Sequence, residues 1–150
     1  MQERIPRPQV YQAQPALVSA LRGLGEAAAA ALEPSLIHLI KLRASQINGC
    51  AFCQHMHTEE ARADGERQVR LDVLPAWREV PVFSERERAA LSWTEKLTRV
   101  ADAGLEDEDF TALNQHFSRE EIVNLSAAVV AINGWNRIAV GFHFLPEIKA

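Results

Sequence analysis

Apolar residues return every three or four positions along most of the chain, and this spacing predicts helices. The first such pattern covers residues 16–32. A second begins at Pro34, because proline is tolerated in the first turn of a helix, and its apolar face is wide enough for deep burial. Asn48 and Gly49 are expected to end this second helix, since both residues tolerate the left-handed conformation that terminates helices.

The residues on either side of these two patterns give a less regular picture. Three prolines within residues 1–15 indicate an extended N-terminal arm. After Gly49, a third helix is expected to open at Cys50 and to run to about Ala63. Residues 66–74 are weakly helical and are followed by Pro75 and Pro81.

The second half of the chain carries two capping boxes, in which a serine and a glutamate three residues later satisfy each other's backbone N–H groups. Ser84 and Glu87 form the first, and Ser118 and Glu121 form the second and begin the longest apolar pattern. A short acidic helix is expected between them. No segment shows the strict alternation of a strand, so we predict an all-α fold of about six to seven helices in a single domain over residues 1–150.

Composition excludes several classes of protein. The length of 150 residues suits one domain with its own core, and the net charge of −4 offers no basic surface for nucleic acid. No apolar run approaches the roughly 20 residues of a membrane span, and no secretory signal is visible, so we expect a cytoplasmic protein without a membrane partner.

The candidate chemistry is concentrated directly after Gly49. Cys50 and Cys53 are three residues apart, which places their Cβ atoms about 5–6 Å apart on one helix face and permits a dithiol–disulfide cycle. A helix N-terminus lowers the pKa of a cysteine there. His57 lies on the same stripe and is suited to proton transfer, whereas His55 points away from it.

These residues leave alternatives open. Helix position favours Cys50 as the activated thiolate, while the four-residue spacing favours Cys53 as the partner of His57. A structural zinc site built from the two cysteines, His55 and His57 is a competing interpretation, but helical geometry sends His55 away from the others.

The segment Leu42–Cys53 and the following Met56 and His57 closely resemble the CxxCxxxH core of AhpD-like alkylhydroperoxidases, in the carboxymuconolactone decarboxylase superfamily. The resemblance continues through Phe83–Glu87 and Asn133–Arg137. It implies an all-helical homo-oligomer, a trimer or hexamer, that reduces organic hydroperoxides or hydrogen peroxide with electrons from an external dithiol reductant. No metal, flavin or haem cofactor is implied, and decarboxylation is not expected, because the decarboxylase branch lacks this cysteine pair.

By position, the resemblance assigns Cys53 as the peroxidatic cysteine, Cys50 as the resolving cysteine and His57 as the proton-relay base. Twelve residues before Cys50 the family commonly has a relay glutamate, and this chain has His38 there. An imidazole can pass a proton, but it has no negative charge to orient another histidine. A second hypothesis is therefore a redox-responsive interaction protein with little turnover.

Overall fold

The computed structural model describes residues 1–148, and all of its regular elements are helical, which confirms the predicted all-α class. Nine α-helices and one 3-10 helix lie within this range and no strand does, against the six to seven helices expected. Their bounds are α1 Arg7–Ala13, α2 Pro15–Ala29, α3 Pro34–Ile47, α4 Ala51–Ala63, α5 Gln68–Val73, η1 Leu74–Glu79, α6 Glu85–Thr98, α7 Val100–Ala103, α8 Asp107–Asn114 and α9 Arg119–Phe142.

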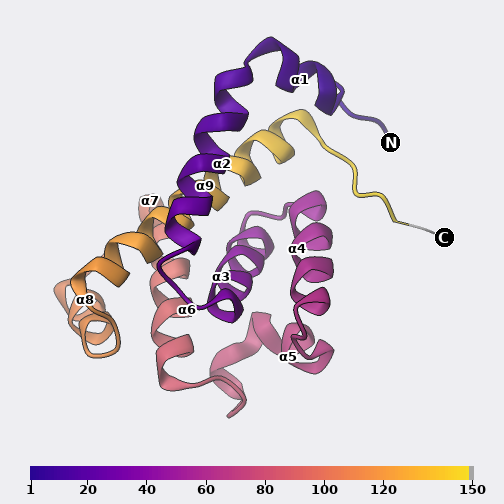
Figure 1. Ribbon diagram of the computed structural model, residues 1–150. Helices are drawn as coiled ribbons and strands as arrows, with labels where there is room; N and C mark the ends of the chain where they lie inside the picture. Colours follow the sequence, from indigo (N-terminus) through magenta and orange to yellow (C-terminus); the bar gives the residue numbers. More distant parts are fainter. Residues whose placement is uncertain (149–150) are drawn as a thin grey trace.

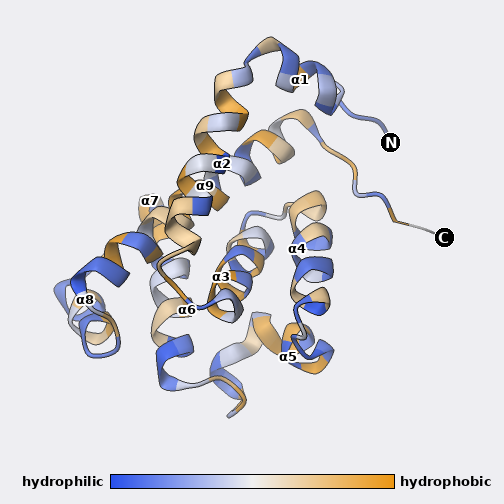
Figure 2. Cartoon of the chain, viewed as in Figure 1, coloured by the Kyte–Doolittle hydropathy of each residue, from blue (hydrophilic) through white to orange (hydrophobic). Residues whose placement is uncertain are grey.

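Helix α3 lies at the centre of the molecule, between α4, α6 and α9 (Figure 1). One of its faces joins an apolar cluster with α6 and α9 through Leu36 and Ile40, and another joins a cluster around η1 through Leu39 and Leu42. These four side chains are almost completely buried. In Figure 2, α3 carries both orange and blue residues, whereas the outlying α8 is largely hydrophilic. The wide apolar face predicted for this helix therefore reflects burial on several sides.

Helices α2 and α9 lie against each other along much of their length (Figure 1). Gly134 permits this approach, because a Cβ atom at that position would lie 2.8 Å from Leu21 Cδ2. A side chain there would force Leu21 to move. The two helices thus form one wall of the molecule, and the candidate site lies between this wall and α4.

The prediction of an extended arm over residues 1–15 is wrong for most of that segment. Arg7–Ala13 is helical, and α2 already begins at Pro15. The prolines stand in the first turns of the two helices, where a missing backbone N–H has no cost, so they start helices here. Val10 is buried, and Tyr11 contacts the rings of Trp135 and Phe144 edge-on.

The helix starts predicted from the capping boxes are confirmed. Ser84 accepts from the Glu87 N–H at 3.1 Å, and Ser118 accepts from the Glu121 N–H at 3.2 Å. The remaining difference in helix number arises where a short α7 follows α6 as a separate turn and where α5 and η1 divide the weakly helical segment.

Arg86 ties three parts of the chain together near the start of α6. Its guanidinium donates to Glu33 Oε1 at 2.6 Å and to Glu121 Oε1 at 2.7 Å, and it lies 4.0 Å above the Phe117 ring. The pKa of each carboxyl group is lowered, chiefly by its hydrogen bond from Arg86.

Within residues 1–148 no helix is both long and apolar enough to cross a membrane.

Candidate active site around Cys53 and His57

The turn between α3 and α4 sets the position of the first cysteine. Gly49 has a φ of 63°, a left-handed conformation that side chains rarely adopt, and this conformation ends α3. The chain then reverses so that the Cys50 N–H donates to the carbonyl oxygen of Ser45 at 3.0 Å. Cys50 becomes the N-cap of α4, one residue before the helix proper, as the predicted helix start required.

The Cys50 sulfur is placed to carry negative charge. It accepts a hydrogen bond from the backbone N–H of Cys53 at 3.3 Å, which is the bond a capping side chain makes. The neighbouring Cys53 thiol lowers the Cys50 pKa most, and the Cys53 N–H and the Asn136 side chain lower it further, to about 7 despite burial. Cys50 is therefore the preferred location of the first thiolate.

The pKa of the Cys53 thiol is shifted in the opposite direction. Its pKa is raised, mainly by its contact with Cys50 and then by burial. Both cysteines are reduced and both are only 1% exposed, so the pair accommodates one negative charge and not two. Cys53 differs from Cys50 in access, because it lines the main cavity of the described residues and Cys50 does not.

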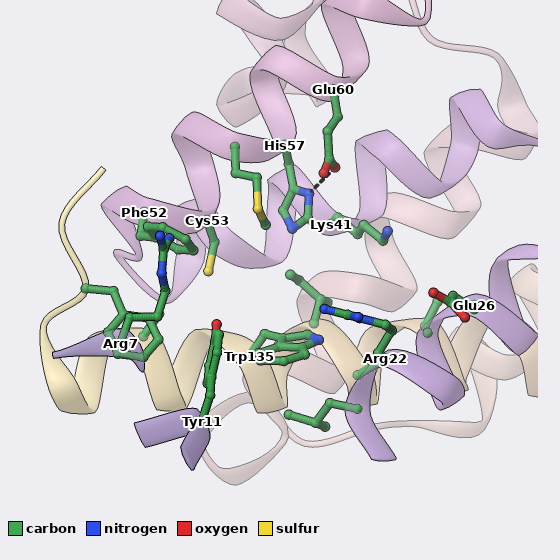
Figure 3. A pocket seen from close by; sticks show the side chains of 18 residues that line it. Arg7, Tyr11, Arg22, Glu26, Lys41, Phe52, Cys53, His57, Glu60 and Trp135 are labelled. Atoms are coloured by element: carbon green, nitrogen blue, oxygen red, sulfur yellow. Dashed lines mark hydrogen bonds and ion pairs between the residues drawn. The ribbon is translucent and has the colours of Figure 1, made fainter. Parts of the chain in front are cut away.

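His57 stands one turn after Cys53 and lines the same cavity. Only 5% of His57 is exposed, and its Nδ1 lies 2.8 Å from Glu60 Oε2 (Figure 3). A carboxylate accepts only, so Nδ1 donates and Nε2 is left free to exchange a proton. The hydrogen bond from His57 is also the main reason why the pKa of Glu60 is lowered.

The cavity has a volume of about 520 Å³ and lies between α4 and the wall formed by α2 and α9. Figure 3 shows the Cys53 sulfur, the His57 ring and the Tyr11 hydroxyl pointing into it. Its lining combines large apolar side chains with several charges. The apolar and aromatic members include Tyr11, Phe52, Met56, Ile132, Trp135 and Phe144, and the charged members are Arg7, Arg22, Glu26, Lys41 and Glu60.

The other two histidines considered from the sequence lie outside this cavity. His38 Nε2 is 2.7 Å from Asp64 Oδ2, and the ring lines a second, smaller pocket. Its charge contributes only a minor part of the lowering of the Glu60 pKa. His55 is half-buried on another face of α4, as its spacing predicted. The carboxylate that touches His57 therefore comes from its own helix, and not from the position occupied by His38.

A buried polar network holds the start of α4 against α9. Asn48 Nδ2 donates to Asn133 Oδ1 at 3.0 Å and to Asn136 Oδ1 at 2.9 Å, and Asn136 Nδ2 donates to Ser45 Oγ at 3.0 Å. Asn136 is fully buried. This network ties the turn that carries Cys50 to a segment near the C-terminus of the chain.

Several residues of this site escaped the sequence reasoning. Glu60 was detectable, because a carboxylate three residues after His57 lies on the same helix face. Tyr11 was hidden in the supposed arm. Trp135 and Met56 also line the cavity. Across residues 1–148, no three histidine, cysteine, aspartate or glutamate side chains converge in a way that could hold a metal ion.

The sequence profile of the carboxymuconolactone decarboxylase family matches residues 15–96, more than half of the chain. The chain belongs to this family. It is 42% identical over 102 residues to the uncharacterized protein YdfG of Bacillus subtilis, covering 68% of this chain and 69% of YdfG.

Two solved structures have a fold similar to that of this chain. A protein of unknown function from Agrobacterium tumefaciens, described as a candidate antioxidant defence protein AhpD, is 44% identical, with a TM-score of 0.92 over 99% of this chain and 100% of that one. The debrominase Bmp8 is 22% identical, with a TM-score of 0.80 over 91% of this chain and 74% of that one. The fold of this chain is thus also found in an enzyme, the debrominase Bmp8.

Proposed function

We propose that this protein is a thiol peroxidase that reduces organic hydroperoxides through Cys50 and Cys53. The observation that carries the proposal is the arrangement of one cavity. Cys53 and His57 open into it together, and Cys50 lies directly behind Cys53 at the N-cap of α4. A nucleophile, a proton carrier and a resolving thiol are the three groups that such a reaction requires.

The reaction begins with the loss of one proton from the cysteine pair. His57 accepts this proton at Nε2, and Glu60, hydrogen-bonded at Nδ1, stabilises the resulting imidazolium. The negative charge rests mainly on Cys50, as the lowering of its pKa indicates. When Cys50 takes the remaining thiol proton, the charge passes to Cys53, which faces the cavity. The attacking species is this minor form, with a thiolate at Cys53 and a thiol at Cys50.

The Cys53 thiolate attacks the outer oxygen of the hydroperoxide. The new S–O bond forms as the O–O bond breaks, so sulfur is oxidised to a sulfenic acid and the peroxide is reduced to an alkoxide. The imidazolium of His57 gives its proton to the alkoxide, which leaves as an alcohol. His57 is then neutral again, with its Nδ1 proton still held by Glu60.

Cys50 completes the cycle. Its sulfur attacks the sulfenic acid, a disulfide forms and water leaves. Cys50 and Cys53 are one turn apart at the start of α4, so the disulfide needs no large movement of the chain. An external dithiol then reduces the disulfide by thiol–disulfide exchange and is itself oxidised. This reductant is a required partner.

The proposal is tested with cumene hydroperoxide and dithiothreitol. We expect multiple turnovers per subunit, a loss of two free thiols when peroxide is added without reductant, and no turnover in the Cys53→Ser variant. Free thiols that persist in excess peroxide, or a Cys53→Ser variant as active as the parent, would overturn it. The alternative of a redox-responsive interaction protein predicts disulfide formation without repeated turnover, so the same assay separates the two. The carboxylate of Glu60 beside His57 supports the enzyme, because it supplies the charge that His38 lacks.

We further propose a cytoplasmic homo-oligomer, a trimer or hexamer. Two exposed valines on α9 support this, since Val123 and Val130 are seven residues apart on one face and are 68% and 58% exposed. A second copy of the chain would bury them. Light scattering that gives a monomer at micromolar concentration would contradict the proposal.

A further inference from the structure

The cavity around Cys53 is larger and less polar than hydrogen peroxide requires. Its volume of about 520 Å³ lies in the range of small-molecule sites, whereas a water-sized molecule occupies about 30 Å³. Phe52, Ile132, Trp135 and Phe144 provide apolar walls. Binding is favoured when the apolar surface of an organic group is removed from water against such walls. The substrate of this cavity is therefore expected to carry a sizeable carbon skeleton next to its peroxide.

The same cavity contains two cations that form no close ion pair with a carboxylate of the described residues. Lys41 of α3 and Arg22 of α2 both line it, and in residues 1–148 neither makes an ion pair within 4.0 Å. Figure 3 shows them beyond His57, on the side away from Cys53. A third cation, Arg7, lies near Cys53 but is already engaged, because it stacks 5.0 Å from the Phe52 ring and lies 3.5 Å from Glu147.

Two carboxylates line the cavity and must be weighed against these cations. Glu60 is bonded to His57, and the charge of Lys41 also contributes to the lowering of its pKa. Glu26 follows Arg22 by one helical turn on α2 and reduces the local positive charge. The lining as a whole contains three cations, Arg7, Arg22 and Lys41, against the two carboxylates Glu26 and Glu60. Proton transfer from the cysteine pair to His57 does not change this sum, so the cavity keeps a small surplus of positive charge.

We infer that the preferred substrate is an organic hydroperoxide that also bears a carboxylate. This inference rests on the proposed peroxidase function. The hydroperoxide group lies between Cys53 and His57, the carbon skeleton covers the aromatic wall, and the carboxylate reaches Lys41 and Arg22. A guanidinium binds a carboxylate through two parallel N–H bonds, and an ammonium adds a point charge. The bonds made and broken are those of the peroxidase cycle, with the carboxylate unchanged.

The test compares acids with their own methyl esters as substrates, so that only the charge differs. The probes are the tertiary hydroperoxide of para-isopropylbenzoic acid and the hydroperoxide of linoleic acid, each with its ester, assayed with dithiothreitol as reductant. We expect kcat/KM to be roughly tenfold higher for the acid in at least one pair, which corresponds to about 1.4 kcal/mol. Added salt should reduce the ratio, since part of the attraction is screened.

Variants identify the residues responsible. Arg22→Gln and Lys41→Met should each move the acid-to-ester ratio toward one, and Glu26→Gln should raise it. Arg99→Gln removes a cation from an exposed position outside the cavity and is the matched control, with unchanged ratio and unchanged rates. Each variant is first checked for the circular dichroism spectrum of the parent.

The outcomes separate the two proposals. If neither acids nor esters are consumed, the peroxidase function fails. If both are consumed at equal kcat/KM, the function stands and the inference of a carboxylate-bearing substrate is wrong. A preference for acids that survives both Arg22→Gln and Lys41→Met would also overturn the inference, because these two side chains would not be its source.

Discussion

Replacing Glu60 by glutamine tests whether the carboxylate on α4 supports proton transfer by His57. The variant keeps the size of the side chain and can still accept a hydrogen bond, but it removes the charge opposite the imidazolium. A hydrogen bond to a charged group is worth about 1.5–3 kcal/mol. Because the Glu60 side chain is 47% exposed, solvent screening places the loss near the lower limit, at about 1.5 kcal/mol. Such a loss corresponds to roughly tenfold in an equilibrium constant.

The expected consequence is a smaller population of the thiolate–imidazolium form near neutral pH. We expect kcat/KM for cumene hydroperoxide to fall roughly tenfold, and the rise of kcat/KM with pH to move upward by about one unit. The rate of thiol alkylation by iodoacetamide should show the same displacement, because it reports the thiolate directly. Glu60→Asp, which keeps the charge on a shorter side chain, should recover part of the activity.

The matched control is Glu59→Gln, which removes an exposed carboxylate from the adjacent position of the same helix. Its rate and pH profile should equal those of the parent. Glu59→Gln should unfold in urea with a free energy within about 0.5 kcal/mol of the parent, since surface substitutions away from buried features rarely exceed that. Glu60→Gln should lose no more than the roughly 1.5 kcal/mol of its hydrogen bond. A Glu60→Gln protein with the parent's rate and pH profile would refute the reasoning, and so would an equal loss of activity in Glu59→Gln.

Three further predictions concern the cysteines and the scaffold. Without reductant, Cys50→Ser should consume one equivalent of peroxide and leave a sulfenic acid at Cys53 that dimedone traps and mass spectrometry detects, whereas the parent should leave a disulfide; an equal yield of trapped sulfenic acid in both proteins would contradict the resolving role. Ser118→Ala should lower the free energy of unfolding in urea by about 1 kcal/mol, as the loss of a helix cap usually does, and an unchanged midpoint would count against the cap. Arg86→Leu should destabilise the protein at neutral pH. The difference in the free energy of unfolding between the parent and this variant should shrink below about pH 4. Carboxyl groups whose pKa is lowered in the folded state stabilise the fold above their unfolded pKa, and this stabilisation is lost as the pH falls through their folded pKa. Urea unfolding at both pH values measures this difference, and a constant difference would show that the two carboxylates contribute nothing.

The features that follow from local sequence were predicted well. The capping boxes at Ser84 and Ser118 begin helices, and the Asn48–Gly49 stop before Cys50 is confirmed. Each depends on hydrogen bonds between residues a few positions apart, which the sequence specifies directly. The prolines of the N-terminal segment were misinterpreted because proline is compatible with both an extended chain and the first turn of a helix. Burial of Val10 decides between the two, and that is a tertiary contact.

The residues of the candidate site also fall into two groups, those that local spacing predicts and those that only tertiary packing brings there. The stripe of Cys50, Cys53 and His57 follows from helical spacing, and His55 diverges from it as expected. The contribution of Asn136 depends on how α9 packs against the turn before α4, which no local pattern specifies. Glu60 is the instructive omission. The carboxylate that contacts His57 lies on the histidine's own helix, whereas His38, twelve residues before Cys50, bonds to Asp64 instead.

The sulfur of Cys50 closes the first turn of α4 through the Cys53 N–H, and it is also one half of the proposed redox pair. Oxidation engages this atom in a covalent bond and removes the charge that makes it a good acceptor. The stability of the first turn of α4 therefore depends on whether Cys50 is reduced or oxidised. An oxidised sample should melt at a different temperature from a reduced one even though no residue has been exchanged. Cys50→Ser keeps an acceptor at the helix start, whereas Cys50→Ala removes it, so comparing these two variants separates structural support from electron transfer.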